Sequence, residues 1–254
     1  MRAIPLRYSD VWKAAGVLLL AAVTTGVAGT PAAPKATDYA GLAKLPDFGG
    51  VWELVFGAPR GGGGPPEQPA LTPDYTAKLK AYQAEGHQDN PTANCLPPGM
   101  PQIMNQPYPI EFLMTPGKIT LVIEAYSQTR RIFTDGRKHP DDPDPTFNGH
   151  SIGRWEGDTL VVDTVALSTD TPMAQSWGVR HSEQMRIEER FHLTAPDTME
   201  IRTTVFDPLA LTKPFTSTKT LARHRDWDIA EYICEQNNRN TVSDDGKAGI
   251  NLNH

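Results

Sequence analysis

Residues 150–165 read HSIGRWEGDTLVVDTV, and this stretch decides the fold class. Two strand-like runs, 150–155 and 159–165, flank the tripeptide EGD at 156–158. A few turn-forming residues between two such runs are typical of a tight β-hairpin. The sequence therefore predicts two antiparallel strands here, with a reversal of the chain between them.

The same strand and turn pattern continues on both sides of this hairpin. Most of the predicted strands follow their sequence neighbour after a short turn, as in TPGK, APDT and RDW. A long meander leaves no free edge when it closes on itself, so we expect an all-β, up-and-down barrel, with a two-sheet sandwich as the alternative. About ten strands are predicted, at 47–55, 110–114, 119–124, 130–133, 150–155, 159–165, 184–193, 199–206, 216–223 and 228–232.

One short helix is predicted among long loops. The 254 residues include 23 prolines, which argues against a helical bundle. Thr72 suits the helix N-cap, Pro73 the first helical position and Gly86 the helix end. The flanking stretches 58–70 and 87–109 are rich in proline or glycine and are predicted to be loops.

The amino-terminal residues resemble a secretory signal. Basic Arg2, Arg7 and Lys13 precede or border the apolar run 14–23, and small residues follow it. The run is too short to span a bilayer comfortably, so residues 1–29 are predicted to be a cleaved signal peptide, with an uncleaved anchor as the alternative. The remaining parts are expected to be a linker at 30–47, a barrel domain at 48–234 and a polar tail at 235–254.

Composition limits the partners and cofactors. The formal net charge is −6 and the sequence has no cluster of Lys and Arg, which disfavours nucleic acid and, once the signal is cleaved, membrane surfaces. The chain lacks GxSxG, P-loop and GxGxxG motifs, so a serine hydrolase, an NTPase or a nicotinamide enzyme is disfavoured. We therefore expect a small-molecule ligand or substrate and no cofactor. The oligomeric state is not indicated.

The two cysteines, Cys95 and Cys234, are expected to pair. A secreted chain enters an oxidising compartment, where two cysteines usually form a disulfide. Two free buried thiols and metal ligation by both are the alternatives.

A histidine and a glutamate are predicted at the mouth of an apolar wall. If a regular strand begins near His181, then His181, Glu183, Met185 and Ile187 share one face, because side chains alternate along a strand. The predicted roles are general base for His181 and orienting carboxylate for Glu183. A pair at the rim that faces solvent is the alternative.

Further acid, base and cationic groups come from neighbouring strands. His139 or His150 is the expected general acid. Asp163 lies in an apolar-rich strand and is expected to be buried, with Arg130, Arg131 or a histidine as its partner. Arg130 and Arg131 are adjacent, so one should point inward, where it would neutralise a carboxylate or bind an anion.

Metal sites have weaker support. Three acidic residues in the loop HPDDPDPTFN offer oxygen ligands for calcium without the spacing of an EF-hand, and three histidines could together hold zinc without a helical zinc motif. These residues are Asp141, Asp142 and Asp144 for calcium, and His139, His150 and His181 for zinc.

Four aromatic residues, Tyr108, Phe112, Tyr126 and Trp155, could line a ligand pocket. The alternative is that they fill the barrel core, as aromatic residues in small barrels usually do.

Several segments resemble a group of secreted bacterial lipocalin-like proteins of uncharacterised activity. The resembling segments are NCLPPGMPQIM (94–104), PYPIEFLMTPGKITLV (107–122), RRIFTDGRKHPDDPDPTFNGHSIGRWEGDTLVVDT (130–164), RHSEQMRIEERF (180–191), ALTKPF (210–215) and YICEQNNRN (232–240). The tripeptide Gly50-Val51-Trp52 is also similar to the lipocalin G-x-W signature. The resemblance implies a lipocalin-like barrel and a secreted address, and it carries no mechanism. The long segments 87–109 and 139–148 depart from lipocalins and predict a lid or a rebuilt mouth.

These observations lead to one hypothesis and two alternatives. The hypothesis is a secreted, cofactor-independent enzyme of the lyase, dehydratase or isomerase type, with a His and carboxylate site in a barrel pocket. The alternatives are a non-catalytic binding protein for an apolar ligand and a metal-dependent hydrolase.

Overall fold

The computed structural model describes residues 36–57, 68–84, 91–173 and 180–236, and the backbone of 241–242 and 248–249. The statements below refer to these residues. The predicted signal peptide, most of the loop 58–70 and the expected helix end at Gly86 lie outside them.

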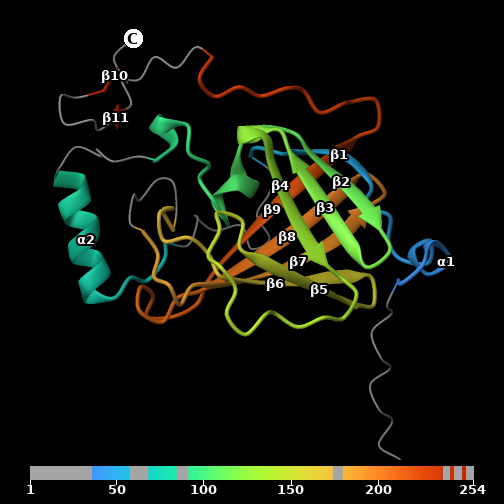
Figure 1. Cartoon of the computed structure of the whole chain (residues 1–254), viewed down its shortest axis with the longest axis horizontal. Helices are drawn as coiled ribbons and strands as arrows, with labels where there is room; N and C mark the ends of the chain where they lie inside the picture. The colour runs from blue at the N-terminus through green and yellow to red at the C-terminus, as the bar shows by residue number, and fades with distance from the viewer. Residues whose placement is uncertain are drawn as a thin grey trace, which may run out of the picture. The chain divides into compact units, whose positions relative to one another are not determined.

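Nine strands form a closed barrel, in which each strand pairs with the next and β9 pairs with β1 (Figure 1). The all-β barrel predicted from the hairpin pattern is confirmed. The strands are β1 Gly50–Leu54, β2 Ile110–Thr115, β3 Lys118–Ile123, β4 Gln128–Phe133, β5 His150–Glu156, β6 Thr159–Val165, β7 Arg186–Ala195, β8 Thr198–Phe206 and β9 Phe215–His224. A separate two-stranded sheet joins β10 Thr241–Val242 to β11 Ala248–Gly249.

The up-and-down order holds at every seam of the barrel except one. β4 and β5 run parallel and pair at Ile132–Ser151 and Phe133–Ile152. Directions alternate around a ring of antiparallel strands, so a closed ring with an odd number of strands must contain a parallel pair. Parallel neighbours need a crossover connection. Residues 134–149 supply it, and we call this segment the crossover loop.

The crossover loop is held at its end by close backbone contacts. Thr146 and Leu167 form a parallel bridge, and the Thr146 amide donates to the Ala166 carbonyl at 3.0 Å. Gly149 has φ of +64°, and a Cβ placed there would lie 2.6 Å from the Val165 carbonyl oxygen. Only glycine fits this turn into β5 without displacing β6.

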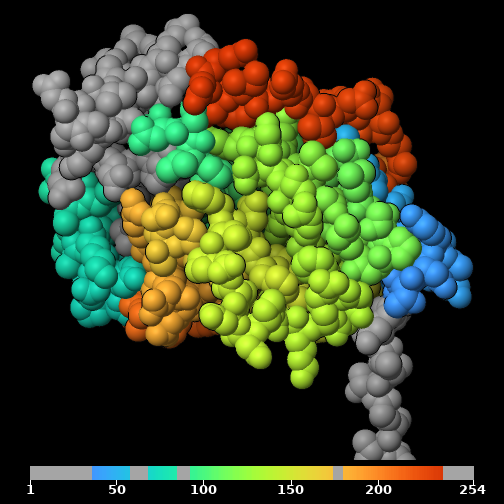
Figure 2. Space-filling model, viewed as in Figure 1, coloured from blue at the N-terminus to red at the C-terminus, as the bar shows by residue number. Residues whose placement is uncertain are grey.

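The tenth predicted strand, 228–232, does not form. Once β9 pairs with β8 on one side and β1 on the other, no free edge remains beside it. The segment instead lies against the region that contains β2 to β4, and Figure 2 shows it in orange-red across their upper side. The Ala230 amide donates to Glu124 at 3.0 Å, and the Ser127 hydroxyl donates to the Tyr232 carbonyl at 2.9 Å.

Alternating side chains fill the barrel interior. In β3, Ile119, Leu121 and Ile123 are buried and the residues between them are partly exposed. Near β1, Trp52 and Phe112 meet edge to face at 6.4 Å between ring centroids, and the Trp52 indole donates to the Phe48 carbonyl at 2.9 Å. Burial of each such side chain stabilises the fold by about 1.5–3 kcal/mol.

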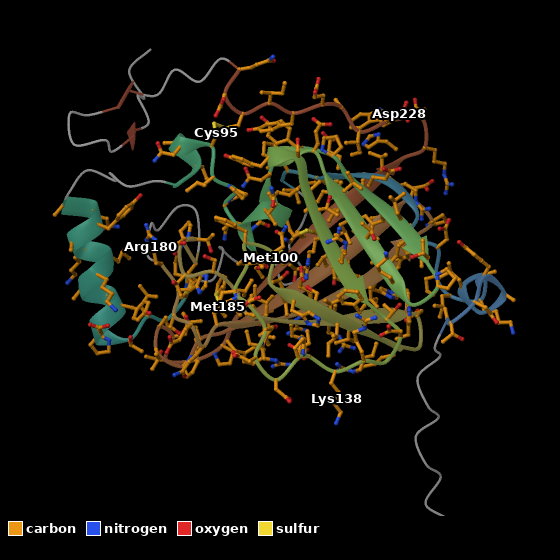
Figure 3. All side chains as sticks on the ribbon, in the orientation of Figure 1. Cys95, Met100, Lys138, Arg180, Met185 and Asp228 are labelled. Carbon is orange, nitrogen blue, oxygen red and sulfur yellow. A yellow bond between two sulfur atoms is a disulfide. The ribbon has the colours of Figure 1, made fainter. Side chains whose placement is uncertain are left out.

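The long segment before β2 adds to this core. Three of its residues, Met100, Ile103 and Met104, are buried in the cluster that the strands form, as is Met185 before β7. Figure 3 labels Met100 and Met185. The segment contains η1 Pro91–Asn94 and η2 Gln102–Asn105, and η3 Ala125–Ser127 follows β3. We call residues 100–106 the plug segment.

The predicted helix is confirmed as α2 Pro73–Ala84, and a short α1 Tyr39–Leu42 lies within the predicted linker. Tyr75 of α2 is buried in the core cluster. The Thr72 hydroxyl donates to the Leu209 carbonyl at 2.9 Å, so it anchors the helix start to the turn after β8. No helix among the described residues is both long and apolar enough to cross a membrane.

The predicted Cys95–Cys234 disulfide is present, with 5.5 Å between the two Cα atoms. Free thiols and metal ligation by these cysteines are therefore excluded in this structure. The bond favours an oxidising compartment, and it joins the segment before β2 to the segment after β9 across 139 positions of sequence.

We expect the double variant C95S/C234S to unfold with a free energy about 2–5 kcal/mol smaller than that of the wild type, because the cross-link restricts the unfolded chain. Urea titration followed by tryptophan fluorescence would measure this difference. Addition of a reductant should lower the wild-type midpoint and leave the double variant unchanged. Equal midpoints for the two proteins without reductant would contradict the expectation.

Candidate functional site

The structure separates the predicted acid, base and cationic residues into different places. Arg130 lies inside the barrel, whereas His139, His150 and Asp163 meet on its outer wall. His181 is buried in a turn before β7, and the other two residues, Glu183 and Arg131, are exposed. The expected convergence of these groups inside the barrel is therefore wrong.

Arg130 forms a buried ion pair with Glu189. The two side chains are 1% and 0% exposed, and Nη2 of Arg130 donates to Oε2 of Glu189. Nη2 also donates to Thr164 Oγ1 at 3.0 Å and to Ser151 Oγ at 3.2 Å. One of the two adjacent arginines points inward as predicted, and its partner is a carboxylate that sequence reasoning missed. The alternation of Ile187, Glu189 and Phe191 along one face could have revealed it.

Two further polar side chains face the same interior. Thr203 of β8 stands directly opposite Glu189, and Lys219 of β9 donates to the Met104 carbonyl at 3.4 Å. Burial lowers the pKa of Lys219 to about 8, and the positive charge of Arg130 adds to this while the Glu189 carboxylate opposes it. We call the set the interior polar cluster: Arg130, Ser151, Thr164, Glu189, Thr203 and Lys219.

Three atoms of this cluster are buried without a hydrogen-bond partner among the described residues. They are Nη1 of Arg130, Oε1 of Glu189 and Oγ1 of Thr203. Native proteins rarely leave such atoms unpaired, because each one costs about 1–3 kcal/mol.

The outer wall of β5 and β6 carries a chain of ionisable groups. Nδ1 of His139 lies 2.7 Å from Nδ1 of His150, and Nε2 of His139 lies 3.5 Å from Oδ2 of Asp163. Arg186 donates from Nε to Oδ1 of Asp163 at 2.6 Å. We call Asp163, His139 and His150 the outer-wall relay.

The position of Asp163 corrects its predicted environment. Its side chain is 21% exposed and faces outward, so it is partly covered rather than buried. Its partners are Arg186 and His139, so the predicted histidine partner is present, whereas Arg130 is paired inside and Arg131 is exposed. The crossover loop brings His139 to the wall.

His150 stacks on an aromatic ring that a guanidinium also contacts. The His150 ring stacks on the Phe133 ring, with 5.5 Å between the two centroids. The Arg137 guanidinium lies 4.0 Å from the centroid of the same Phe133 ring. Burial lowers the pKa of His150, and the charges of His139 and Arg137 lower it further. His150 is therefore a neutral imidazole at pH 7, able to accept a proton.

His181 does not pair with Glu183. β7 begins at Arg186, so residues 181–185 form a turn to which strand alternation does not apply. Nδ1 of His181 donates to the Ser182 carbonyl at 2.8 Å, and Nε2 lies 3.1 Å from the Thr171 hydroxyl. With both ring nitrogens engaged and the side chain buried, His181 holds this turn in place rather than serving as a base.

Neither predicted metal cluster assembles. Among the described residues, no group of three or more His, Cys, Asp and Glu side chains is placed to hold a metal ion. His139 and His150 meet, and His181 binds the separate turn before β7. The three loop carboxylates are exposed.

The four aromatic residues expected to line a pocket divide into two groups. Phe112 and Trp155 are buried in the core, as the alternative proposed. Tyr108 and Tyr126 pack against Tyr232 of the segment after β9, with ring centroids 5.1 and 5.3 Å apart. Burial, reinforced by the neighbouring tyrosines, raises the pKa of Tyr232 to about 12. This aromatic cluster lies near the disulfide and anchors the segment to the barrel.

A groove of about 300 Å³ lies over β1, the start of β2 and the end of β9, and no predicted site residue is among its lining residues. In this groove the rings of His224 and Trp227 stack on each other, with 3.6 Å between their centroids. Its lining residues are Asp47, Gly49, Gly50, Val51, Glu111, Arg223, His224, Arg225 and Trp227.

Together the fold and these sites define a closed, nine-stranded β-barrel protein with a polar cluster inside an otherwise apolar core. No family model and no curated protein matches the chain.

Loss of one partner of the interior ion pair should strongly destabilise the barrel. We expect Glu189→Gln to lower the free energy of unfolding by about 3–5 kcal/mol, because Arg130 is then a buried charge without a counter-charge. Denaturant titration would measure this loss. The double variant Arg130→Met with Glu189→Leu should lose less free energy of unfolding than the two single variants lose in sum. As a control, Arg225→Met at the exposed pair with Asp197 should change stability by about 0–1 kcal/mol. A Glu189→Gln cost no greater than that of the control would contradict the structural role of the pair.

Acidification should also destabilise the fold through His181. Burial lowers the pKa of His181 below its ordinary value of 6.5, so the folded protein holds the neutral form. As the pH falls below 6.5, His181 binds a proton in the unfolded chain but stays neutral in the folded chain. The free energy of unfolding therefore decreases by up to about 1.4 kcal/mol per pH unit. Above pH 6.5 the contribution of neutral His181 to the free energy of unfolding is complete. The urea midpoint should therefore decrease less between pH 7.5 and pH 5.5 for His181→Asn than for the wild type. Equal declines would show that another group is responsible.

Proposed function

We propose that the protein is a secreted enzyme that uses general acid–base catalysis without a cofactor, with His150 as the base. The observation that carries the proposal is the 2.7 Å contact between His139 and His150, with Asp163 behind His139. The site therefore stands on the outer wall of the barrel and not in its interior.

The geometry of the relay sets where the protons reside: His139 and His150 share a hydrogen bond, and Asp163 acts on Nε2 of His139 through its charge at 3.5 Å, without a hydrogen bond. A carboxylate accepts and cannot donate, so Asp163 favours a proton on Nε2 of His139. Nδ1 of His139 then carries a lone pair and accepts the proton of His150 Nδ1. The remaining nitrogen, Nε2 of His150, is left with a lone pair, and the described residues form no hydrogen bond to it. This nitrogen is the proposed proton acceptor.

The relay also stabilises the proton once it has been taken. When Nε2 of His150 accepts a proton, the Nδ1 proton can shift toward His139, whose positive charge then faces Asp163. Arg186 keeps that carboxylate in position. A positioned base of this kind accelerates a reaction by about 10²–10⁴-fold.

The surroundings of His150 indicate the substrate class. Phe133 offers an apolar surface beside the base, and the guanidinium of Arg137 lies over that ring. Arg137 is paired with the Asp135 carboxylate at 2.6 Å, and we propose that its guanidinium also stabilises negative charge that develops on a substrate oxygen. It takes the role that the sequence suggested for Arg130 or Arg131. We therefore infer a small substrate with a proton next to a carbonyl group, in a lyase, dehydratase or isomerase reaction.

The secreted address rests on the amino-terminal sequence pattern and on the Cys95–Cys234 disulfide. Membership of the secreted lipocalin-like group rests on the segments quoted above and is part of the same proposal. The interior ion pair is an unfavourable lining for a carrier of apolar ligands.

Proton exchange into a range of small acids tests the proposal. We expect the wild type to incorporate deuterium from D₂O into some members of a panel of small keto and hydroxy acids, as seen by NMR. His150→Gln should reduce the exchange rate about 10²–10⁴-fold, and His139→Gln and Asp163→Asn should reduce it less. The wild-type rate should rise with pH to a plateau, with its half-maximal point below pH 6.5, because the base must be neutral.

His192→Gln is the matched control, since His192 of β7 also faces a carboxylate, that of Asp158 in the turn after β5, at 3.5 Å. Its exchange rate should equal that of the wild type. If the wild type exchanges no compound of the panel, or if His150→Gln retains the full rate, the relay only fastens the crossover loop to the barrel.

A further inference from the structure

The interior polar cluster contains unpaired atoms of both kinds. Nη1 of Arg130 is a donor, Oε1 of Glu189 is an acceptor, and the Thr203 hydroxyl can be either. All three side chains are at most 2% exposed, and the strands β4, β7 and β8 present them to one interior. A purely structural ion pair would be expected to satisfy its own atoms.

The charges of the cluster do not cancel either. Arg130 and Glu189 neutralise each other, which leaves the Lys219 ammonium with a carbonyl, that of Met104, as its close partner at 3.4 Å. The charged groups facing Lys219 are Glu189 from β7 and Arg130 from β4, and the plug segment presents no charge to it. The interior therefore carries one excess positive charge when Lys219 is protonated.

We propose that the barrel interior binds a small monocarboxylate that also carries a hydroxyl group. The carboxylate accepts hydrogen bonds from Nη1 of Arg130 and from the Lys219 ammonium, and it balances the excess charge. The hydroxyl group of the ligand donates a hydrogen bond to Oε1 of Glu189. The Thr203 hydroxyl forms a further hydrogen bond to the ligand. This ligand pairs all three orphaned atoms, and the site does not depend on the proposed catalytic role of the outer wall.

The proposal predicts a pH dependence of binding with a definite sign. The pKa of Lys219 in the free protein is about 8, so the ammonium is partly deprotonated near that pH. A bound carboxylate favours the charged form and raises this pKa. Binding near pH 8 must therefore take up a proton, and affinity must fall as the pH rises from 7 to 9.

Isothermal titration calorimetry of the full mature chain with lactate, glycolate and 3-hydroxybutyrate tests the site. We expect saturable binding of at least one of them, weaker binding of the matching acid without the hydroxyl, such as propionate, and none of the uncharged lactamide. Titration at pH 8 in buffers of different ionisation enthalpy should reveal the proton uptake.

Lys219→Met should weaken binding about tenfold or more and abolish its pH dependence. Thr203→Val, which keeps the side-chain shape, should weaken binding without loss of the fold. Lys118→Met is the matched control, since this partly buried lysine begins β3 beside the inward-facing Ile119, and it should bind like the wild type. Circular dichroism checks that each variant is folded.

Two results would overturn the proposal. One is the absence of saturable binding for all the hydroxy acids, together with a crystal structure in which ordered water alone bonds the three orphaned atoms. The other is binding that Lys219→Met and Thr203→Val leave unchanged, which would place the carboxylate elsewhere on the protein.

Discussion

Closure of a barrel with an odd number of strands is the constraint on which the rest of the structure depends. Nine strands cannot alternate around a ring, so one neighbouring pair must run parallel, and in this barrel it is β4 and β5. Their connection has to travel back along the barrel, and this requirement creates the crossover loop. The loop carries His139 to the outer wall beside His150 and Asp163. Without the parallel seam, a tight hairpin could join these strands, and no segment would cover that wall.

The same strands carry different chemistry on their two faces, because side chains alternate across a sheet. Inside, β4 and β7 bring Arg130 against Glu189, away from water, where an unpaired charge is costly. Outside, the crossover loop and β5 bring two imidazoles together, and that of His139 faces the Asp163 carboxylate of β6, which is partly in contact with solvent. The interior groups are suited to hold a charged ligand, and the outer groups are suited to move a proton.

Local patterns predicted much of the fold and little of the site. The hairpin at 150–165 and the helix that begins at Pro73 depend on neighbouring residues, so alternation and helix-capping residues were sufficient to find them. The expected pair of His181 and Glu183 failed, because it assumed a strand where the chain turns. Segment 228–232 has a strand-like pattern, and it finds no edge to join because β1 already pairs with β9.

By itself, the sequence determined the all-β class, the strand order of the hairpins and the pairing of its two cysteines, since each follows from short-range pattern or from the number of cysteines. Tertiary structure alone decided which ionisable groups meet. Alternation along β7 can place Glu189 on the inward face, but only closure of the barrel brings Glu189 and Lys219 to Arg130. Such contacts join strands far apart in the chain, and a one-residue change of register would send every one of these side chains to the opposite face.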